Sequence, residues 1–244
     1  MSFRPIFPKS RAKRILLIAL TFTIVVPLIL IARALITLGT VSTYREHWEA
    51  QLRQTPPSNV IRVVGLGDSA MQGIGASTPD ESVYGRISEH IAARTGRPVY
   101  QANISVTGAK VADVLRDQLP QLQKLQPDII VVSVSGNDAN QQVDIKQFER
   151  DINTLYAALP KDITIVSDVP GVDHREAYQP ILLEAASKHG LTVAPVYENF
   201  APHDDKITSY AGDFFHPSSK GYKYWFNAYR PAVDKLLVSI EKTE

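Results

Sequence analysis

Three residues of the types used in nucleophilic catalysis, Ser69, Asp213 and His216, are the first candidates for chemistry in this sequence. Ser69 follows the β-branched run Val60–Val64 and the segment Gly65-Leu66-Gly67, whose glycines allow a sharp turn at the end of a strand. Ligands of open α/β sheets bind at the carboxyl edge, so a hydroxyl there is a candidate nucleophile. The alternative is ordinary turn chemistry, because Asp and Ser side chains also bond to their own backbone.

Asp213 stands three residues before His216. At this spacing the carboxylate can reach the imidazole ring, fix its tautomer and stabilise the imidazolium. With Ser69, these residues supply a nucleophile, a general base and an orienting acid in the chain order Ser, Asp, His. The other histidines are assigned to a linker, to helix surfaces or to loops: His47, His90, His174, His189 and His203.

The hydrophobic pattern of the remaining chain predicts the strands and helices that must bring these residues together. Strand-like apolar runs alternate with helical periodicity, and a closing helix is expected from Ser219. This alternation predicts an α/β fold of three layers, α/β/α, with a doubly wound, flavodoxin-like parallel sheet of five strands. The expected strands are Val60–Val64, Val99–Ile104, Ile129–Val134, Ile163–Val169 and Leu191–Val196, and the helices between them are expected near 83–94, 111–122, 145–159 and 178–189.

An apolar segment near the amino terminus predicts a membrane helix. Ile15–Ala32 carries no charge and at 1.5 Å per residue spans about 27 Å, close to the roughly 30 Å of a hydrocarbon core. Apolar residues continue past Arg33 to Leu38. The segment is preceded by basic residues and no acid, so the positive-inside rule predicts a cytoplasmic amino terminus and an extracytoplasmic remainder. These basic residues are Arg4, Lys9, Arg11, Lys13 and Arg14.

The expected division of the chain is a cytoplasmic basic tail (1–14), a transmembrane signal anchor (15–38), a linker (39–58) and a folded domain (59–244). Within the linker, Tyr44 and Trp48 are expected at the outer membrane interface. A cleaved signal peptide, which would leave a secreted domain, is the alternative, because Ala32-Arg33-Ala34 has the Ala-x-Ala form. The apolar region is longer than the h-region of a signal peptide, about 7 to 15 residues, and therefore favours the anchor.

Composition excludes several classes of function. The chain of 244 residues has 26 Lys and Arg against 25 Asp and Glu, so it lacks the basic excess that captures nucleic acid, and no such partner is expected. It contains no cysteine, and hence no disulfide, thiolate metal site or cysteine nucleophile. No metal and no cofactor are expected, and the chain is expected to be a monomer.

A dinucleotide-binding Rossmann domain is a rival interpretation of the first turn, because Gly65–Ala70 also satisfies G-x-G-x-x-A after a strand. That function needs an acid at the end of the second strand to hold a ribose, and the sequence has Asn103 there. Asp68 would also repel a pyrophosphate. Both observations weaken this rival.

Four sequence blocks, in order, resemble the SGNH hydrolases, also called GDSL-type esterases and lipases. Gly67–Ala70 matches the first block except for its final leucine, which is Ala70 here, and Asn103–Gly108 is similar to the second, with the family glycine at its last residue. The third block, Gly-x-Asn-Asp, aligns with Ser135–Asp138, where a serine replaces the first glycine. The last, Asp-x-x-His, aligns with Asp213–His216.

This resemblance implies a serine esterase that needs no cofactor. Ser69 would attack an acyl carbonyl, His216 would take its proton, and Asp213 would orient His216. The oxyanion hole would comprise the backbone N–H groups of Ser69 and Gly108 and the side-chain amide of Asn137. The structural alternatives are a helix-start glycine at Gly108 and a plain turn at Asn137-Asp138.

The expected substrates are acyl esters, with short acyl chains favoured. The membrane is the expected partner of the amino-terminal helix. An acyltransferase that moves acyl groups onto or off envelope glycans or lipids is the alternative activity. Both activities share the acyl-enzyme step, so the sequence leaves them open.

Overall fold

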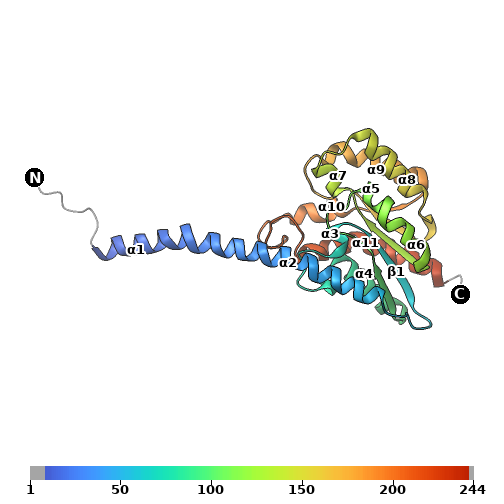
Figure 1. Ribbon diagram of the computed structural model, residues 1–244, viewed down its shortest axis with the longest axis horizontal. Coiled ribbons are helices and arrows are strands. Elements are labelled where there is room, and N and C mark those ends of the chain that lie inside the picture. Colours follow the sequence, from blue (N-terminus) through green and yellow to red (C-terminus); the bar gives the residue numbers. More distant parts are fainter. Residues whose placement is uncertain (1–8, 242–244) are drawn as a thin grey trace, which may run out of the picture.

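The computed structural model of the chain describes residues 9–241, which form an α/β domain and one long helix that projects from it (Figure 1). Residues 1–8, which include Arg4 of the expected basic tail, lie outside the described residues.

A five-stranded parallel sheet forms the centre of the domain. Its strand order is β2-β1-β3-β4-β5, and all neighbouring strands pair in parallel. This is the doubly wound, flavodoxin-like order with its switch point between β1 and β3, so the fold class predicted from the sequence is confirmed. The strands are β1 (Ile61–Gly67), β2 (Val99–Asn103), β3 (Ile129–Ser133), β4 (Thr164–Ser167) and β5 (Thr192–Ala194).

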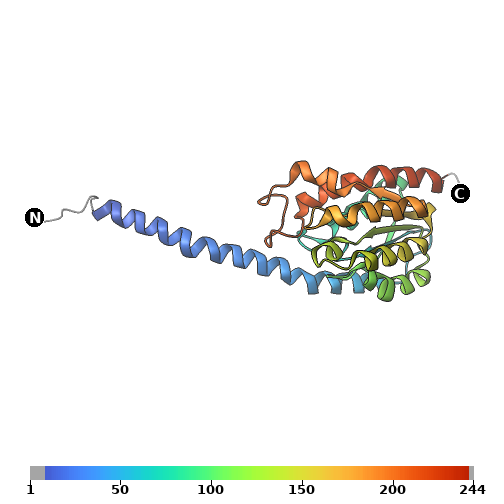
Figure 2. The same ribbon diagram turned by 90° about the horizontal axis from the view of Figure 1, so that it is seen from above.

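Helices cover both faces of the sheet and create two hydrophobic cores (Figure 2). Helices α4 (Val83–Thr95) and α11 (Ser219–Glu241) pack on one face. Helices α8 (Ile145–Ala157) and α9 (Arg175–His189) pack on the other. Shorter helical segments are α3 (Ser69–Gln72), η2 (Pro79–Glu81), α5 (Val111–Asp113), η3 (Val114–Gln118), α6 (Leu119–Leu125), α7 (Gly136–Asn140), η4 (Lys161–Ile163), α10 (Val196–Phe200) and η5 (Ala201–His203).

The projecting helix consists of α1 (Lys9–Leu20), the π-helical turn η1 (Thr21–Val25) and α2 (Val26–Leu52). The π turn lies just before Pro27, which has no N–H for the regular helical pattern. The large apolar side chains from Ile15 to Ile36 are exposed. Within residues 9–241 this is the one helix that is long and apolar enough to be a candidate membrane span.

The carboxyl-terminal part of α2 corrects the expected linker over residues 39–58. The helix continues to Leu52, and Tyr44 and Trp48 are buried in the domain core instead of lying at a membrane interface. Thr37, Val41, Tyr44 and Trp48 recur every three or four residues, which is the spacing of one helix face. The mixed charge that suggested a linker therefore belongs largely to the exposed face of a packed helix, and only residues 53–60 form an irregular connection to β1.

Candidate active site

The turn after β1 presents Ser69 at the carboxyl edge of the sheet. Gly67 has φ +143°, and a Cβ at this position would overlap the carbonyl oxygen of Ser133 on β3, so the turn requires glycine. Asp68 caps helix α3 by accepting a hydrogen bond from the Ala70 N–H at 2.9 Å. Ser69 lies at the carboxyl end of the first strand, as the sequence predicted, and it is also the first residue of that short helix, which the sequence did not predict.

The structure brings Ser69 and His216 together although 147 positions separate them. Ser69 Oγ lies 2.9 Å from His216 Nε2, and His216 Nδ1 lies 2.6 Å from an Asp213 carboxylate oxygen. Because a carboxylate only accepts, Nδ1 carries the proton and Nε2 accepts from the serine hydroxyl. The three predicted residues thus form one continuous chain of hydrogen bonds.

A tight loop holds Asp213 and His216 in this position. The loop is closed by an antiparallel bridge between Tyr210 and Pro217. The second oxygen of Asp213 accepts hydrogen bonds from the backbone N–H groups of Phe215 and His216, each at 3.1 Å. Burial raises the pKa of Asp213, but the hydrogen bonds and the charge of His216 outweigh burial, and the pKa is lowered. The carboxylate is therefore ionised at neutral pH, as an imidazole-orienting acid must be.

Gly108 lies in a turn tied to helix α3, which begins at Ser69. Its φ of +84° lies in the left-handed region, and its side-chain direction is open. The preceding Thr107 N–H donates to the side-chain oxygen of Gln72, the last residue of α3, at 3.2 Å. Helix α5 begins only at Val111, so Gly108 is not a helix-start glycine. Among the hydrogen bonds of residues 9–241, the Gly108 N–H has no acceptor, which leaves it free for a ligand.

Asn137 lies in the first turn of α7, between the other two turns. Its Nδ2 donates to the Ala109 carbonyl at 3.0 Å and lies 3.4 Å from an Asp68 carboxylate oxygen. One amide hydrogen therefore fixes the side chain on the Ala109 carbonyl, and the other makes a long hydrogen bond to Asp68 in the turn of Ser69. The preceding Ser135 adopts φ +112°, so this backbone follows a glycine-like path although it lacks the family glycine.

Two further buried carboxyl groups lie beside these turns. Burial raises the pKa of Asp68 to about 6, against the hydrogen bond from Ala70 and the charge of His216. Burial likewise raises the pKa of Asp138 to about 7, against the hydrogen bond from Val111 and with a further rise from the charge of Asp68. Asp138 accepts the Val111 N–H at 3.1 Å and so caps helix α5. Both carboxyls hold backbone turns of the site in place.

A cavity of about 190 Å³ lies beside the Ser69 hydroxyl. Ser69, Asn137 and His216 line it, whereas Gly108 does not. A cavity of this size with a largely apolar wall suits a small acyl group. The wall includes Ala70, Val196, Phe200, Tyr210, Phe214, Phe215, Pro217 and Trp225.

Several residues that position the site were missed by the sequence analysis. Gln118 holds the end of β1, since its side chain both donates to the Gly67 carbonyl and accepts from the Gly67 N–H, each at 2.8 Å. Trp48 Nε1 donates to the Gln72 carbonyl at 2.9 Å, which ties α2 to the end of α3. Their sequence signals are weak: a polar residue on an apolar helix face, and an aromatic residue at helical spacing.

The end of β2 does not support the dinucleotide-binding alternative. Asn103 is buried, and its Nδ2 donates to the Met71 carbonyl at 2.8 Å. Its Oδ1 accepts the Ser105 N–H at 3.1 Å, so the side chain is occupied within the protein. Over the described part of the chain, no group of three or more His, Cys, Asp or Glu residues is arranged to hold a metal ion.

A parallel α/β sheet with this Ser-His-Asp arrangement at its carboxyl edge is typical of serine hydrolases. The sequence profile of the GDSL-like Lipase/Acylhydrolase family matches residues 66–224, and the chain belongs to this family. This confirms the resemblance carried by the four sequence blocks and identifies the protein as a hydrolase. A comparison with curated proteins gave no match.

Solved structures share the fold at low sequence identity. TesA is 18% identical with a TM-score of 0.61, over 72% of this chain and 99% of that chain. The lipase/acylhydrolase from Enterococcus faecalis is 19% identical with a TM-score of 0.61, over 72% of this chain and 95% of that chain. The Clostridium thermocellum family 3 carbohydrate esterase is 17% identical with a TM-score of 0.60, over 73% and 98%. These similarities establish a common fold.

Proposed function

We propose that the protein is a serine esterase that works through an acyl-enzyme. The 2.9 Å contact between Ser69 Oγ and His216 Nε2, with Asp213 on the far side of the imidazole, carries this proposal. Ser69 Oγ attacks the ester carbonyl while its proton passes to His216, which then gives that proton to the departing alcohol. Water attacks the acyl-enzyme next, His216 takes its proton and returns it to Ser69, and the free acid leaves.

Three donors would stabilise the tetrahedral oxyanion: the N–H groups of Ser69 and Gly108 and the Asn137 side-chain amide. The Ser69 N–H is at the first position of α3, where no helical acceptor exists. The Asn137 amide is fixed by the Ala109 carbonyl and lines the cavity. Donors held rigidly in this way are usually the largest single contribution to catalysis of acyl transfer.

The substrates would be esters of short acyl groups. The cavity volume of about 190 Å³ supports this, because a long acyl chain needs a longer groove. Two relatives with this fold are described as a family 3 carbohydrate esterase and an acetyl-xylooligosaccharide esterase. The second name specifies an acetyl ester, which agrees with a small acyl group in the site.

The exposed apolar helix would anchor the protein in the cytoplasmic membrane, with residues 1–14 inside and the domain outside. The basic residues before Ile15 support this orientation. A retained anchor is favoured over a cleaved signal because cleavage after Ala34 would cut a continuous helix just before Thr37, which is packed on the domain. The intact mass of protein purified from membranes tests this: loss of residues 1–34 would contradict the anchor.

Hydrolysis of p-nitrophenyl acetate by the full chain in detergent micelles tests the esterase. Ser69→Ala and His216→Ala should each lower kcat by about 10⁶-fold, because members of a triad act as a unit. Asn137→Ala should keep the fold, checked by circular dichroism, and lower kcat by about 10² to 10³-fold, the usual value of one oxyanion donor.

His90→Ala is the matched control. His90 Nε2 also lies 2.8 Å from a carboxylate, that of Asp234, but this pair joins α4 to α11 outside the cavity. His90→Ala should hydrolyse p-nitrophenyl acetate as fast as the unsubstituted protein does. Equal rates for the unchanged protein and Ser69→Ala would end the proposal. Product analysis with an added alcohol separates the two activities, since acyl transfer to that alcohol in place of release as free acid would identify an acyltransferase.

A further inference from the structure

Helix α2 leaves the domain at the carboxyl edge of the sheet. Near the carboxyl end of α2, the Leu52 carbonyl accepts a hydrogen bond from Tyr100 Oη at 3.2 Å, close to the start of β2. Farther toward its amino end, Tyr44 and Trp48 bond to the chain that follows Ser69. The helix therefore runs antiparallel to the strands. Its exposed extension projects beyond the edge that carries Ser69 (Figure 1 and Figure 2).

Where the helix leaves the domain, it touches the loop of the Asp-His pair. The Gly212 N–H donates to Thr37 Oγ1 at 3.1 Å. A side chain at Gly212 would overlap the Arg33 carbonyl, so glycine permits this close approach. The candidate membrane helix thus contacts the position next to Asp213.

The exposed apolar part of the helix is about as long as a bilayer is thick. Between Ile15 and Ile36 the large apolar side chains are 37% to 71% exposed. Its uncharged part, Ile15–Ala32, spans about 27 Å at 1.5 Å per residue, against a hydrocarbon core of roughly 30 Å. Because Arg33 and Thr37, just beyond this part, already contact Gly212, the 204–217 loop lies at the bilayer surface when the helix spans the membrane.

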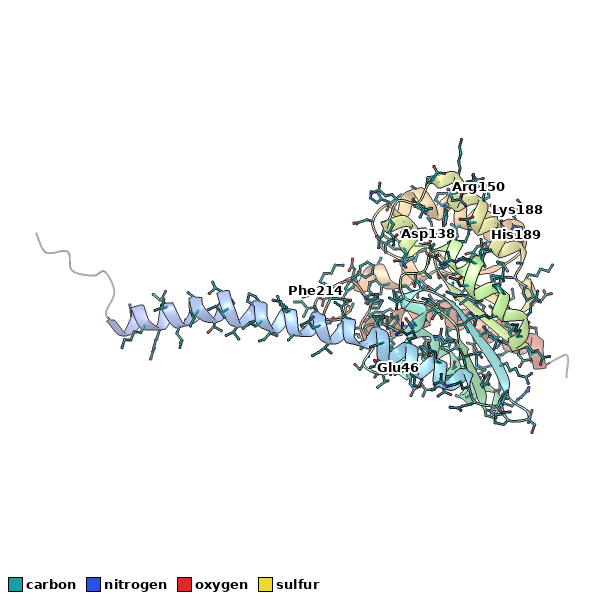
Figure 3. All side chains as sticks on the ribbon, viewed as in Figure 1. Glu46, Asp138, Arg150, Lys188, His189 and Phe214 are labelled. Carbon is teal, nitrogen blue, oxygen red and sulfur yellow. The ribbon has the colours of Figure 1, made fainter. Side chains whose placement is uncertain are left out.

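This loop exposes three apolar side chains: Ile207 is 73%, Phe214 38% and Phe215 49% exposed. Phe214 lies at the end of the domain from which the helix projects (Figure 3). It also has φ +56°, a conformation that costs energy for a residue other than glycine. The first three residues of the loop, Asp204-Asp205-Lys206, carry charges of both signs, so contact with a lipid surface would be apolar and not electrostatic.

We infer that Ile207, Phe214 and Phe215 form a membrane-contact surface, and that the site takes its acyl esters from lipids of the bilayer that holds the helix. Phe214 and Phe215 also line the cavity beside Ser69, so the membrane-contact surface continues into the site. The short acyl group enters the cavity while the lipid that carries it stays in the bilayer. The reaction rests on the proposed esterase function, whereas contact with the membrane does not.

A single-cysteine label tests the membrane contact without any activity. The chain has no cysteine, so Ile207→Cys can carry one polarity-sensitive fluorophore. Val238→Cys is the control, because Val238 is 43% exposed near the end of α11, whose carboxyl end lies opposite the projecting helix (Figure 1). In the full chain reconstituted into phosphatidylcholine vesicles, spin-labelled lipid should quench the label at 207 and not the label at 238, at low and high salt alike. Equal quenching at both positions would overturn the inference.

Two substrates of different location test the lipid source of the ester. Ile207→Asp should lower acetate release from 1,2-dioleoyl-3-acetylglycerol in the same vesicles about tenfold, because one buried apolar contact is lost. Hydrolysis of water-soluble p-nitrophenyl acetate should change by less than about twofold, and Val238→Asp should alter neither rate. If the unsubstituted protein cleaves p-nitrophenyl acetate but not the bilayer ester, the inference about lipid esters is overturned and the proposed esterase function stands. Failure on both substrates, with the label at 207 still quenched, overturns the esterase and leaves the membrane contact standing.

Discussion

Among single residues, Ser135 carries the clearest strain near the site. Its φ of +112° is one that glycine adopts freely and other residues avoid. Its Oγ is buried and has no hydrogen-bond partner among the described residues, which adds the cost of an unsatisfied polar group. The sequence shows that a serine replaces the family glycine, but it does not show that the backbone keeps the conformation of glycine.

Ser135→Gly should therefore stabilise the protein. Removing the strained φ and the unpaired hydroxyl should raise the free energy of unfolding by about 1 to 2 kcal/mol, measured by urea denaturation. Ser88→Gly is the control: the Ser88 Oγ is also buried without a hydrogen-bond partner among residues 9–241, but Ser88 lies inside α4, where glycine costs about 1 kcal/mol, so this variant should be less stable than Ser135→Gly. A loss of stability in Ser135→Gly would contradict the strain.

Asp68 gives a pH dependence of stability. Burial raises its pKa from the ordinary 3.8 to about 6, so between these values the folded state binds a proton that the unfolded state releases. The free energy of unfolding should therefore fall as the pH rises from about 4 to about 6, by up to roughly 3 kcal/mol at 1.36 kcal/mol per pKa unit.

Asp68→Asn should make this part of the stability curve less steep, and the slope that remains comes from Asp138, whose pKa burial also raises. Asparagine is uncharged and still caps the Ala70 N–H. Its amide faces the Asn137 amide 3.4 Å away, so the variant also carries a cost that does not depend on pH. The informative quantity is the difference between unfolding free energies at pH 4 and pH 6, and parallel curves for both proteins would refute the assignment.

Among the elements, periodicity predicted the strands and main helices because each has one environment along its length. β3 is buried at every residue, and its uninterrupted apolar run showed this. The ends are less predictable: the run Leu191–Val196 yields only Thr192–Ala194 as β5, since Pro195 has no N–H for the sheet and Val196 begins α10. The sequence analysis predicted a linker where α2 packs on the domain, because beyond Thr37 only one face of this helix is apolar.

Tyr44→Phe measures what α2 contributes to the loop after Ser69. Tyr44 Oη donates to the Ala76 carbonyl at 2.7 Å in a buried setting. Removing the hydroxyl leaves that carbonyl without this donor and should lower the free energy of unfolding by about 1 to 3 kcal/mol. Tyr197→Phe is the control, because Tyr197 is partly exposed and contacts Arg175 through its ring, so its change should stay within about 0.5 kcal/mol. Equal effects would mean that α2 does not support the loop.

For the whole molecule, the sequence predicted which residues meet, because the strand order brings loop ends to one edge of the sheet. Ser69 and His216 follow from that rule and from their residue types. The direction in which the projecting helix leaves the domain does not follow from any local pattern. It depends on contacts between residues far apart in the sequence, such as that of Thr37 with Gly212, 175 positions apart, which only the folded chain defines.

Gly212→Ala tests whether the projecting helix and the loop of Asp213 and His216 are mechanically coupled. The added methyl group would overlap the Arg33 carbonyl, so either the helix or the loop must shift. Because Asp213 is the next residue, the shift should disturb the carboxylate that orients His216, and kcat on p-nitrophenyl acetate should fall about tenfold, since a displacement near 1 Å can cost up to about 100-fold. Gly39→Ala is the matched control, because Gly39 lies in α2, the helix that contains Arg33. Nothing lies within 4 Å of the Gly39 side-chain position, and alanine favours a helix. If both variants hydrolyse p-nitrophenyl acetate as fast as the unsubstituted protein, the helix does not act on the site; if only Gly212→Ala loses activity, the helix helps to hold the loop of Asp213 and His216.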